Sequence, residues 1–343
     1  MKKDLNIYYK GNHLFSYGCL FMLIIGARGL GKTYLAKKYL LKNYFRKGYI
    51  FCVLRDNINA IKELTDNNCN NFLKDIKKDP TLLKYFTEDT KIDYKNNILY
   101  INDKIAGYFY ACSTFYNLKG NDLSDINTIL YDEFIKEKTQ NKRGNRALEF
   151  LNMVETIGRM RGKESKLRIL LTANALDLGD DIINIFGFSE IKGYGYYLNR
   201  KKSAVLHYAD NSLQFKESKL KSISGILTTD TAFADNLINN KFLTHKINLL
   251  IEKPKGLDFI AIFRNEDNEK IKLYYYNSCL YCERETKEDT YSGRRFVSNI
   301  KLVNLDYLLA SDNFIKNVKN YFASNHIYFN SNYAYTIFKS IFI

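Results

Sequence analysis

The sequence of 343 residues contains no tryptophan, only two prolines and four histidines. None of its apolar runs approaches the ~20 residues that a membrane-spanning helix needs, so we expect no transmembrane segment. Residues 1–11 are polar and carry lysines, unlike a secretory signal peptide. The six cysteines are scattered, and Cys279-x-x-Cys282 lacks the second Cys or His pair of a zinc site. We therefore expect a reduced, intracellular protein whose cysteines bind no metal.

Acidic residues are the minority charge, with 37 Asp and Glu against 52 Lys and Arg and a net charge of +15. This excess favours a polyanionic partner, either nucleic acid or an acidic membrane surface. Apolar residues make up 46% of the chain, which is typical of a globular protein and excludes a disordered one. The length allows two or three domains, each with its own core.

The strongest motif follows the apolar run at residues 19–25 and precedes a helical pattern at residues 33–45. It fits the P-loop pattern G-x-x-x-x-G-K-[ST] and reads Gly26-Ala27-Arg28-Gly29-Leu30-Gly31-Lys32-Thr33. Glycines let several backbone N–H groups converge on phosphate at a helix N-terminus. We expect Lys32 to neutralise the β- and γ-phosphates and the Thr33 hydroxyl to hold Mg²⁺. A chance glycine-rich turn is the alternative.

The second motif is the pair Asp132-Glu133, which closes an apolar strand predicted at residues 126–131. In P-loop NTPases the first acid holds Mg²⁺, and the second polarises the water that attacks the γ-phosphate. A solvated strand end is the ordinary interpretation of such a pair. Its place about 100 residues after a complete P-loop favours the catalytic interpretation.

A third polar cluster ends the buried strand predicted at residues 167–171. NTPases place a γ-phosphate sensor at the tip of the strand beside the acidic one, so Asn174 and Thr172 are sensor candidates. The alternative for both is an Asx turn that only ends the strand.

The remaining pattern indicates α/β organisation. We expect a P-loop domain with a parallel sheet over residues 1–208, a helical linker at 209–243, and a smaller β-rich domain at 244–343. In the first domain, strand 49–54 follows the P-loop helix, a helical stretch at 57–78 is interrupted at 65–71, and 91–111 forms a meander. Residues 145–160 form an amphipathic helix, 179–197 a loop-rich stretch, and 201–208 a last strand. The C-terminal part contains strands at 245–251, 257–263, 271–276 and 296–300, then helical stretches at 305–343.

Three segments resemble the DNA-packaging ATPase of small protein-primed podophages, the phi-29-like group: residues 26–34, 132–138 and 151–159. The resemblance is firm over about residues 15–175. Arg55 after the second strand, and the Lys119-Gly120 loop, also resemble large terminases. The Asp-Glu pair points to the additional-strand, RecA-like class of P-loop proteins, which includes recombinases and ring translocases.

The resemblance implies a homo-pentameric ring that hydrolyses ATP with Mg²⁺ and drives double-stranded DNA into a procapsid. The ring would act in the host cytoplasm at the portal vertex, with a packaging RNA where one is present and without a membrane. Arg159 would act in trans as an arginine finger on the neighbour's ATP, and Lys119 would act at the subunit interface. Arg161 is the alternative finger, and a solvated helix end is the ordinary role for either arginine.

The resemblance also implies that the C-terminal domain is RNase H-like and has lost its metal-binding acids. Asp258 is the one acid near the start of its first strand, and we identify no convincing second or third carboxylate for two-metal cleavage, so we expect no nuclease activity. A nucleic-acid ATPase of replication or recombination is the rival function. An adaptor with a relic P-loop is disfavoured because Lys32, Thr33, Asp132 and Glu133 are all present. Residues 57–71 or 95–104 would face the DNA channel.

Overall fold

The computed structural model describes residues 8–118, 122–135, 146–162, 164–175, 180–188, 191, 193–228, 248–250, 252–285 and 293–343. The chain divides into two compact units. Unit 1 comprises Met1–Asp177, Ile185–Phe188 and Lys192–Leu243, and unit 2 comprises Leu178–Asn184, Ser189–Ile191 and Thr244–Ile343. No helix within the described ranges combines the length and apolarity needed to cross a bilayer.

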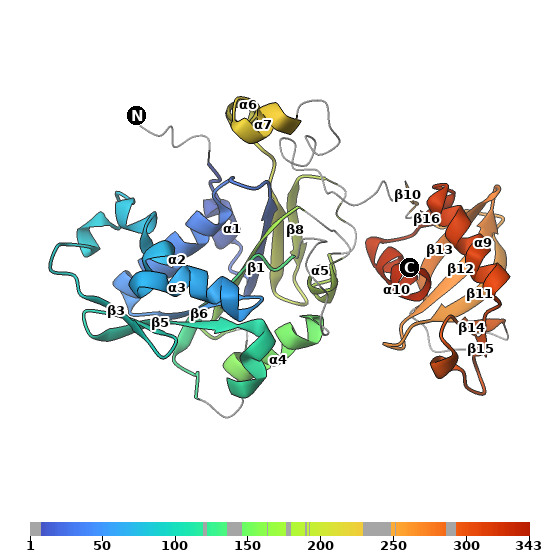
Figure 1. Cartoon of the computed structure of the whole chain (residues 1–343), viewed down its shortest axis with the longest axis horizontal. Helices are drawn as coiled ribbons and strands as arrows, with labels where there is room; N and C mark the ends of the chain where they lie inside the picture. The colour runs from blue at the N-terminus through green and yellow to red at the C-terminus, as the bar shows by residue number, and fades with distance from the viewer. Residues whose placement is uncertain are drawn as a thin grey trace. The chain divides into compact units, whose positions relative to one another are not determined.

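Unit 1 is built on one nine-stranded sheet with the order β3-β4-β5-β2-β6-β7-β1-β9-β8 (Figure 1). All neighbours from β5 to β9 are parallel, whereas β3, β4 and β8 pair antiparallel at the two edges. Strand β7 therefore lies between β1 and β6. The strands are β1 (Phe21–Gly26), β2 (Ile50–Arg55), β3 (Ile92–Lys95), β4 (Ile98–Ile101), β5 (Lys104–Ala111), β6 (Ile126–Asp132), β7 (Arg168–Asn174), β8 (Gly195–Asn199) and β9 (Ala204–Tyr208).

Helices cover both faces of this sheet, because its central strands are apolar on both sides. On β1, Met22 and Ile24 face a core that includes Leu40 of α2 and Phe72 of α3. On the opposite face, Phe150 of α4 stacks on Tyr131 of β6. The helices on these faces are α1 (Asn12–Ser16), α2 (Lys32–Lys47), α3 (Ile58–Leu73) and α4 (Arg146–Gly158), and α5 (Asp181–Ile185) is divided between the two units.

Local backbone signals end several of these elements where the sequence predicts. Gly48 adopts a left-handed conformation (φ 68°) and donates to the carbonyls of Asn43 and Tyr44, which ends α2. Helix α3 is broken at residues 66–69, inside the predicted interruption, and Asn57 caps its start by accepting from Ala60 N–H. The two turns of the predicted meander have positive φ angles at Asn96, Asn97, Asn102 and Asp103, as two-residue hairpin turns require.

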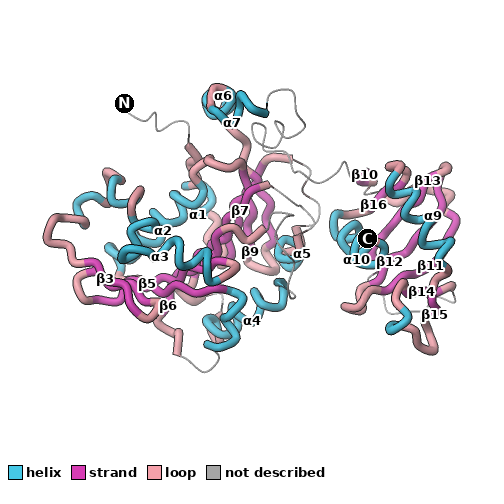
Figure 2. Tube along the Cα trace, in the orientation of Figure 1, coloured by secondary structure: helices cyan, strands magenta, loops and turns pink. Residues whose placement is uncertain are grey.

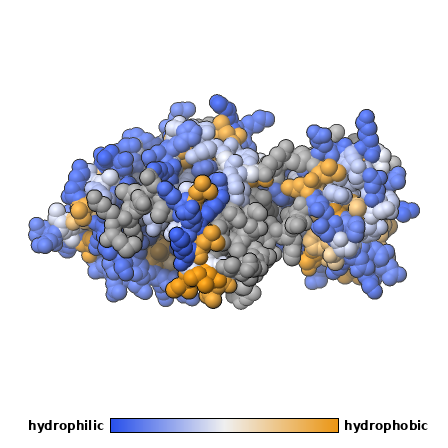
Figure 3. All heavy atoms as spheres, turned by 90° about the horizontal axis from the view of Figure 1, so that it is seen from above, coloured by the Kyte–Doolittle hydropathy of each residue, from blue (hydrophilic) through white to orange (hydrophobic). Residues whose placement is uncertain are grey.

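Helices α6 (Leu213–Leu220) and α7 (Ile223–Thr228) belong to unit 1. They start the stretch that the sequence indicates as a helical linker, and residues 229–247 lie outside the described part of the chain. Figure 3 looks down on the side of the unit that carries α6 and α7, where hydrophobic atoms lie beside strongly hydrophilic ones. The exposed apolar residues on these two helices are Leu213, Leu220, Ile223, Ile226 and Leu227.

Unit 2 is a seven-stranded mixed sheet with the order β10-β16-β13-β12-β11-β14-β15 (Figure 2). Helices α9 (Asp312–Ala323) and α10 (Asn332–Phe342) pack on one face of it, around Phe263 and Phe338. Strands β11, β12 and β13 pair antiparallel, and β14 and β15 continue the sheet in parallel from β11. The strands are β10 (Asn248–Leu249), β11 (Asp258–Arg264), β12 (Lys270–Tyr276), β13 (Cys279–Glu285), β14 (Arg295–Val297), β15 (Leu308–Leu309) and β16 (Ile327–Phe329).

The structure corrects the sequence interpretation in three places. Strand β13 lies where the sequence analysis predicts no strand. The residues alternate along a strand, and Cys282 is buried whereas Cys279 is partly exposed. Strand β8 occupies the end of the stretch predicted to be loop-rich, and β15 and β16 lie within residues predicted to be helical. These strands are short or polar, so their existence depends on their neighbours in the sheet.

Candidate nucleotide site

The predicted P-loop connects the end of β1 to the start of α2. Gly29 and Gly31 have φ angles of 85° and 96°, a left-handed backbone that glycine adopts without a steric penalty. The loop therefore turns sharply into the N-terminus of α2, whose first N–H groups have no partner within the helix. Such an end is suited to bind phosphate.

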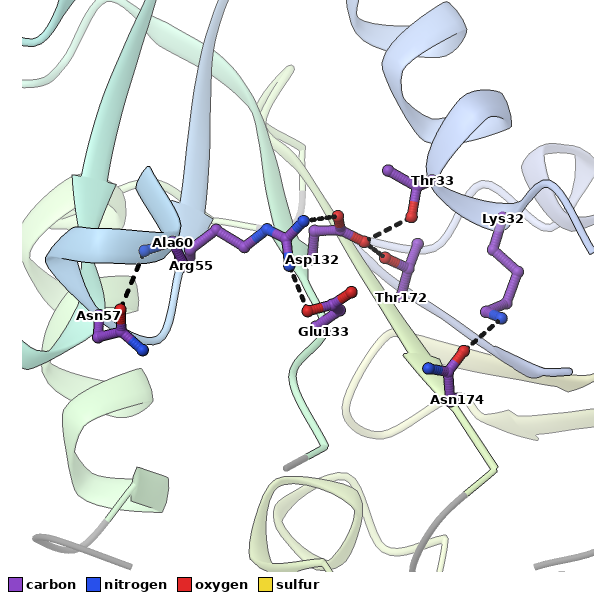
Figure 4. A network of polar contacts seen from close by, with 9 residues as sticks. All are labelled: Lys32, Thr33, Arg55, Asn57, Ala60, Asp132, Glu133, Thr172 and Asn174. Atoms are coloured by element: carbon purple, nitrogen blue, oxygen red, sulfur yellow. Dashed lines mark hydrogen bonds and ion pairs between the residues drawn. The ribbon is translucent and has the colours of Figure 1, made fainter. Parts of the chain in front are cut away.

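Lys32 lies at the first position of α2 and is buried, with an exposed fraction of 6%. Its Nζ donates to the carbonyls of Gly26 (2.9 Å) and Ala27 (2.7 Å) and to Asn174 Oδ1 (3.1 Å) (Figure 4). Burial lowers the pKa of Lys32 to about 8, although the carboxylates of Asp132 and Glu133 partly oppose this shift. The cation is therefore held at the loop, and the sensor candidate Asn174 touches it directly.

Asp132 is the centre of the polar network in Figure 4 and is 2% exposed. Its Oδ1 accepts hydrogen bonds from the Thr33 hydroxyl (2.8 Å) and from the Thr172 hydroxyl. Its Oδ2 is paired with Arg55 Nη2 at 3.1 Å. Asp132 thus joins β6 to α2, β7 and β2. Thr33 and Asp132 present a hydroxyl and a carboxylate side by side, which are oxygen ligands that Mg²⁺ takes, so the donor set fits this ion.

Glu133 follows Asp132 directly but lies in a different environment. Its side chain is 62% exposed, and its backbone has a φ angle of 59°. The guanidinium of Arg55 forms an ion pair with this carboxylate as well as with Asp132. One carboxylate is therefore buried and hydrogen-bonded while its neighbour faces solvent.

Sequence reasoning missed that Arg55 contacts both acids. The available signal was its position at the carboxyl end of β2, because β2 pairs in parallel with β6 and Leu54 lies opposite Tyr131. Neighbouring parallel strands have their carboxyl ends on the same side of the sheet, so a charged residue at the end of β2 lies near the acids at the end of β6.

Arg159 and Arg161 lie near the start of β6, at the opposite end of the parallel strands from the P-loop. The guanidinium of Arg161 donates to the carbonyls of Leu123 (3.1 Å) and Ile126, at the start of β6, and burial lowers its pKa. The pKa of Asp122 is lowered by its hydrogen bonds with Ser124 and, further, by the charges of Arg159 and Arg161. A strand of seven residues is about 20 Å long. Neither side chain spans that distance, so neither arginine reaches Asp132 of its own chain.

Two predicted features cannot be placed in this site. Lys119, with the adjoining Gly120, lies outside the described residues. Asp258 begins β11 in unit 2 and is exposed. Within the described ranges, no group of three or more His, Cys, Asp or Glu side chains is arranged to hold a metal ion. Arg28, inside the P-loop, is exposed.

Comparisons with known proteins agree with this geometry. The family model of the podovirus DNA encapsidation protein (Gp16) matches residues 1–335. The DNA packaging proteins of Bacillus phages PZA and phi29 are each 23% identical to this chain over 258 residues, which is 75% of this chain and 72% of theirs. The DNA packaging protein of Bacillus phage B103 is 24% identical over 248 residues, 72% of each chain.

Solved structures show the same fold. A chain of the bacteriophage phi-29 viral genome packaging motor assembly matches with a TM-score of 0.69 and 18% identity, over 97% of this chain and 99% of that one. The N-terminal domain of the DNA packaging ATPase from bacteriophage phi29 matches with a TM-score of 0.51 and 25% identity, over 61% of this chain and 98% of that one. The resemblance predicted from the motifs is therefore confirmed, and this chain belongs to the podovirus DNA encapsidation family, a family of DNA-packaging proteins.

Proposed function

We propose that this chain is the ATPase of a viral DNA-packaging motor, which hydrolyses ATP in a homomeric ring to drive double-stranded DNA into a procapsid. The observation that carries the proposal is the 2.8 Å hydrogen bond from Thr33 to Asp132. It joins the P-loop helix to the acidic strand, 99 residues apart in the chain, which supports a single metal and phosphate site. A chance glycine-rich turn would not require a hydrogen bond between the following helix and the acidic strand.

In this proposal each side chain has a separate task. The P-loop N–H groups and Lys32 bind the β- and γ-phosphates. Thr33 and Asp132 would hold Mg²⁺, which supplies charge neutralisation to the phosphates when bound. Glu133 faces solvent and is the base that takes a proton from the attacking water, and Arg55 keeps its carboxylate beside Asp132. Asn174 senses the γ-phosphate through its contact with Lys32.

The position of Arg159 supports the ring. Arg159 lies near the start of β6, about the length of that strand away from Asp132. An arginine finger at this position would therefore serve a neighbouring subunit. We infer from the family resemblance that the ring is a pentamer at the procapsid portal, with a packaging RNA where one is present. The net charge of +15 supports double-stranded DNA as the polyanion that the ring holds.

Two fold assignments belong to the same proposal. The position of β7 between β1 and β6 supports the additional-strand, RecA-like class for unit 1. In unit 2, the antiparallel β11–β13 meander continued by two parallel strands supports an RNase H-like sheet. We keep the expectation from the sequence that this domain, with Asp258 exposed at the start of β11, does not cleave DNA.

The test compares ATP turnover of the purified protein alone, with DNA, and with DNA and procapsids. Lys32→Ala should lose nucleotide binding, because it removes the cation of the P-loop. Glu133→Gln should keep binding and lose turnover by about 10²-fold or more, because it removes the base. A Glu133→Gln protein with normal turnover contradicts the assigned base.

The procapsid arm separates packaging from its rival. Turnover that rises only when procapsids and DNA are both present supports the packaging motor. Equal stimulation by DNA with and without procapsids supports instead a nucleic-acid ATPase of replication or recombination.

A further inference from the structure

Helix α6 lies against the P-loop, although it comes much later in the chain. Its start is capped by the Ser212 hydroxyl, which accepts from Phe215 N–H at 3.1 Å. Phe215 is buried in a small cluster with Ala27, Leu30 and Ala209. Ala27 and Leu30 are P-loop residues, so apolar packing fixes α6 directly on the loop that binds phosphate.

Lys219 lies one turn after Phe215 on the same face of α6. A Cβ atom placed on Gly29 would be 3.7 Å from Lys219 Nζ, so the ammonium adjoins the P-loop backbone. Lys219 is half-buried, whereas Glu217 and Leu220 on the same helix are exposed. The neighbouring Lys216 is different, because its Nζ is paired with Asp210 at 3.4 Å.

We propose that Lys219 is a further phosphate-contacting residue of the nucleotide site, supplied by α6 and acting in addition to Lys32. The inference rests on the proposed function, since it requires that the P-loop binds a nucleoside triphosphate. The P-loop backbone cradles the β- and γ-phosphates, so a cation beside Gly29 lies where their negative charge arrives. A charge-assisted hydrogen bond from Lys219 would then hold α6 more firmly on an occupied loop than on an empty one.

As a consequence, the stability of α6 packing on the P-loop would depend on whether nucleotide is bound. Lys32 is anchored by two carbonyls of the loop and by Asn174 of β7, whereas Lys219 belongs to a separate helix that nucleotide can hold or release. Helix α7 follows directly, with Ile223 and Leu227 exposed, so a change in α6 reaches a surface that carries apolar side chains.

The test measures binding of ATP, ADP and inorganic tripolyphosphate to the full chain. Lys219→Ala should weaken ATP and tripolyphosphate binding by about tenfold, the effect of one lost hydrogen bond to a charged group. Lys219→Arg should retain most of the affinity, because it keeps the charge. Amide hydrogen exchange in residues 213–220 should slow when ATP binds to the wild type and should not slow in Lys219→Ala.

The matched control is Lys221→Ala, which removes an exposed lysine at the end of the same helix and should bind ATP like the wild type. If Lys219→Ala unfolds, Lys219→Gln replaces it, and equal melting temperatures establish that the variant is folded. The inference is overturned if Lys219→Ala matches Lys221→Ala, or if it loses ATP affinity but binds tripolyphosphate normally. A folded wild type that binds neither ligand, or a Lys32→Ala variant that binds normally, refutes the proposed function instead.

Discussion

At the scale of single residues, the site separates two carboxylates by environment. Asp132 is buried and held in place by Thr33, Thr172 and Arg55, which orients the carboxylate that we propose as a metal ligand. Glu133 is exposed, so its carboxylate can meet water. The same division of labour is expected wherever one acid must bind a cation and its neighbour must accept a proton.

Nucleotide binding should depend on pH through Lys32. Burial lowers its pKa to about 8, and bound phosphate favours the charged ammonium, so the complex has the higher pKa. ATP affinity should therefore be full below pH 8 and fall as pH rises through that value, approaching about tenfold per pH unit.

Titration calorimetry checks this dependence, because proton uptake on binding makes the heat depend on the ionisation enthalpy of the buffer. The measurement should start near pH 7.5 and end near pH 9.5, so that it spans the pKa range of interest. An affinity that stays constant over this range, or proton release on binding, contradicts the assignment.

At the scale of elements, a buried acid ties the P-loop helix to the segment that follows α3. Asp79 is 2% exposed and accepts from Tyr34 (2.5 Å) and from Lys38 (2.8 Å), both on α2. It also accepts from the backbone and hydroxyl of Thr81. Burial alone would raise the pKa of Asp79, but the hydrogen bonds from Lys38, Thr81 and Tyr34 outweigh it and lower the pKa to about 2.

Asp79→Asn should lower the free energy of unfolding by about 2–3 kcal/mol at neutral pH, because Lys38 and Tyr34 lose a charged acceptor. The folded pKa is lowered, so this stabilisation is present above the unfolded value of about 4 and is lost as pH falls toward about 2. Denaturant unfolding at neutral and acidic pH measures the difference.

The matched control is Asp103→Asn, whose carboxylate pairs with Lys91 on the surface with 75% of the Asp103 side chain exposed. It should change stability little, because exposed ion pairs contribute at most about 1 kcal/mol. An Asp79→Asn variant as stable as Asp103→Asn would show that the buried acid does not brace α2.

At the scale of the whole molecule, different functional residues lie at the two ends of the parallel strands of the unit 1 sheet. The P-loop and both acids lie where the parallel strands end, whereas Arg159 and Arg161 lie where β6 begins. Arg161 is committed to backbone carbonyls of its own chain. Arg159 is exposed, and it is the better candidate to act on a neighbouring subunit.

Arg159→Ala should bind ATP and lose turnover by at least about 10³-fold, the usual contribution of an arginine finger. Mixing it with Lys32→Ala should restore part of the activity, because an intact P-loop from one variant then meets an intact Arg159 from the other. ATP turnover as a function of mixing ratio measures this recovery. Two inactive variants that stay inactive at every ratio rule out action in trans.

What the sequence alone determined is local. The P-loop, the end of α2 at Gly48, the break in α3 and the asparagine turns of the meander were all predictable. Each depends on backbone conformations that glycine and asparagine favour, and these preferences act over a few neighbouring residues. The motifs were also sufficient to recognise the family.

Only the tertiary structure decided which distant residues meet. The pairing of Thr33 with Asp132, and of Arg55 with both acids, follows from the order of β1, β7, β6 and β2 in the sheet. The existence of strand β13 also depends on which elements pack together. The same is true of the location of Arg159 and Arg161, near the start of β6 and away from the acids at its end. Strand order depends on how apolar faces are buried over the whole unit. The pattern of apolar residues within one strand does not indicate which strands will be its neighbours.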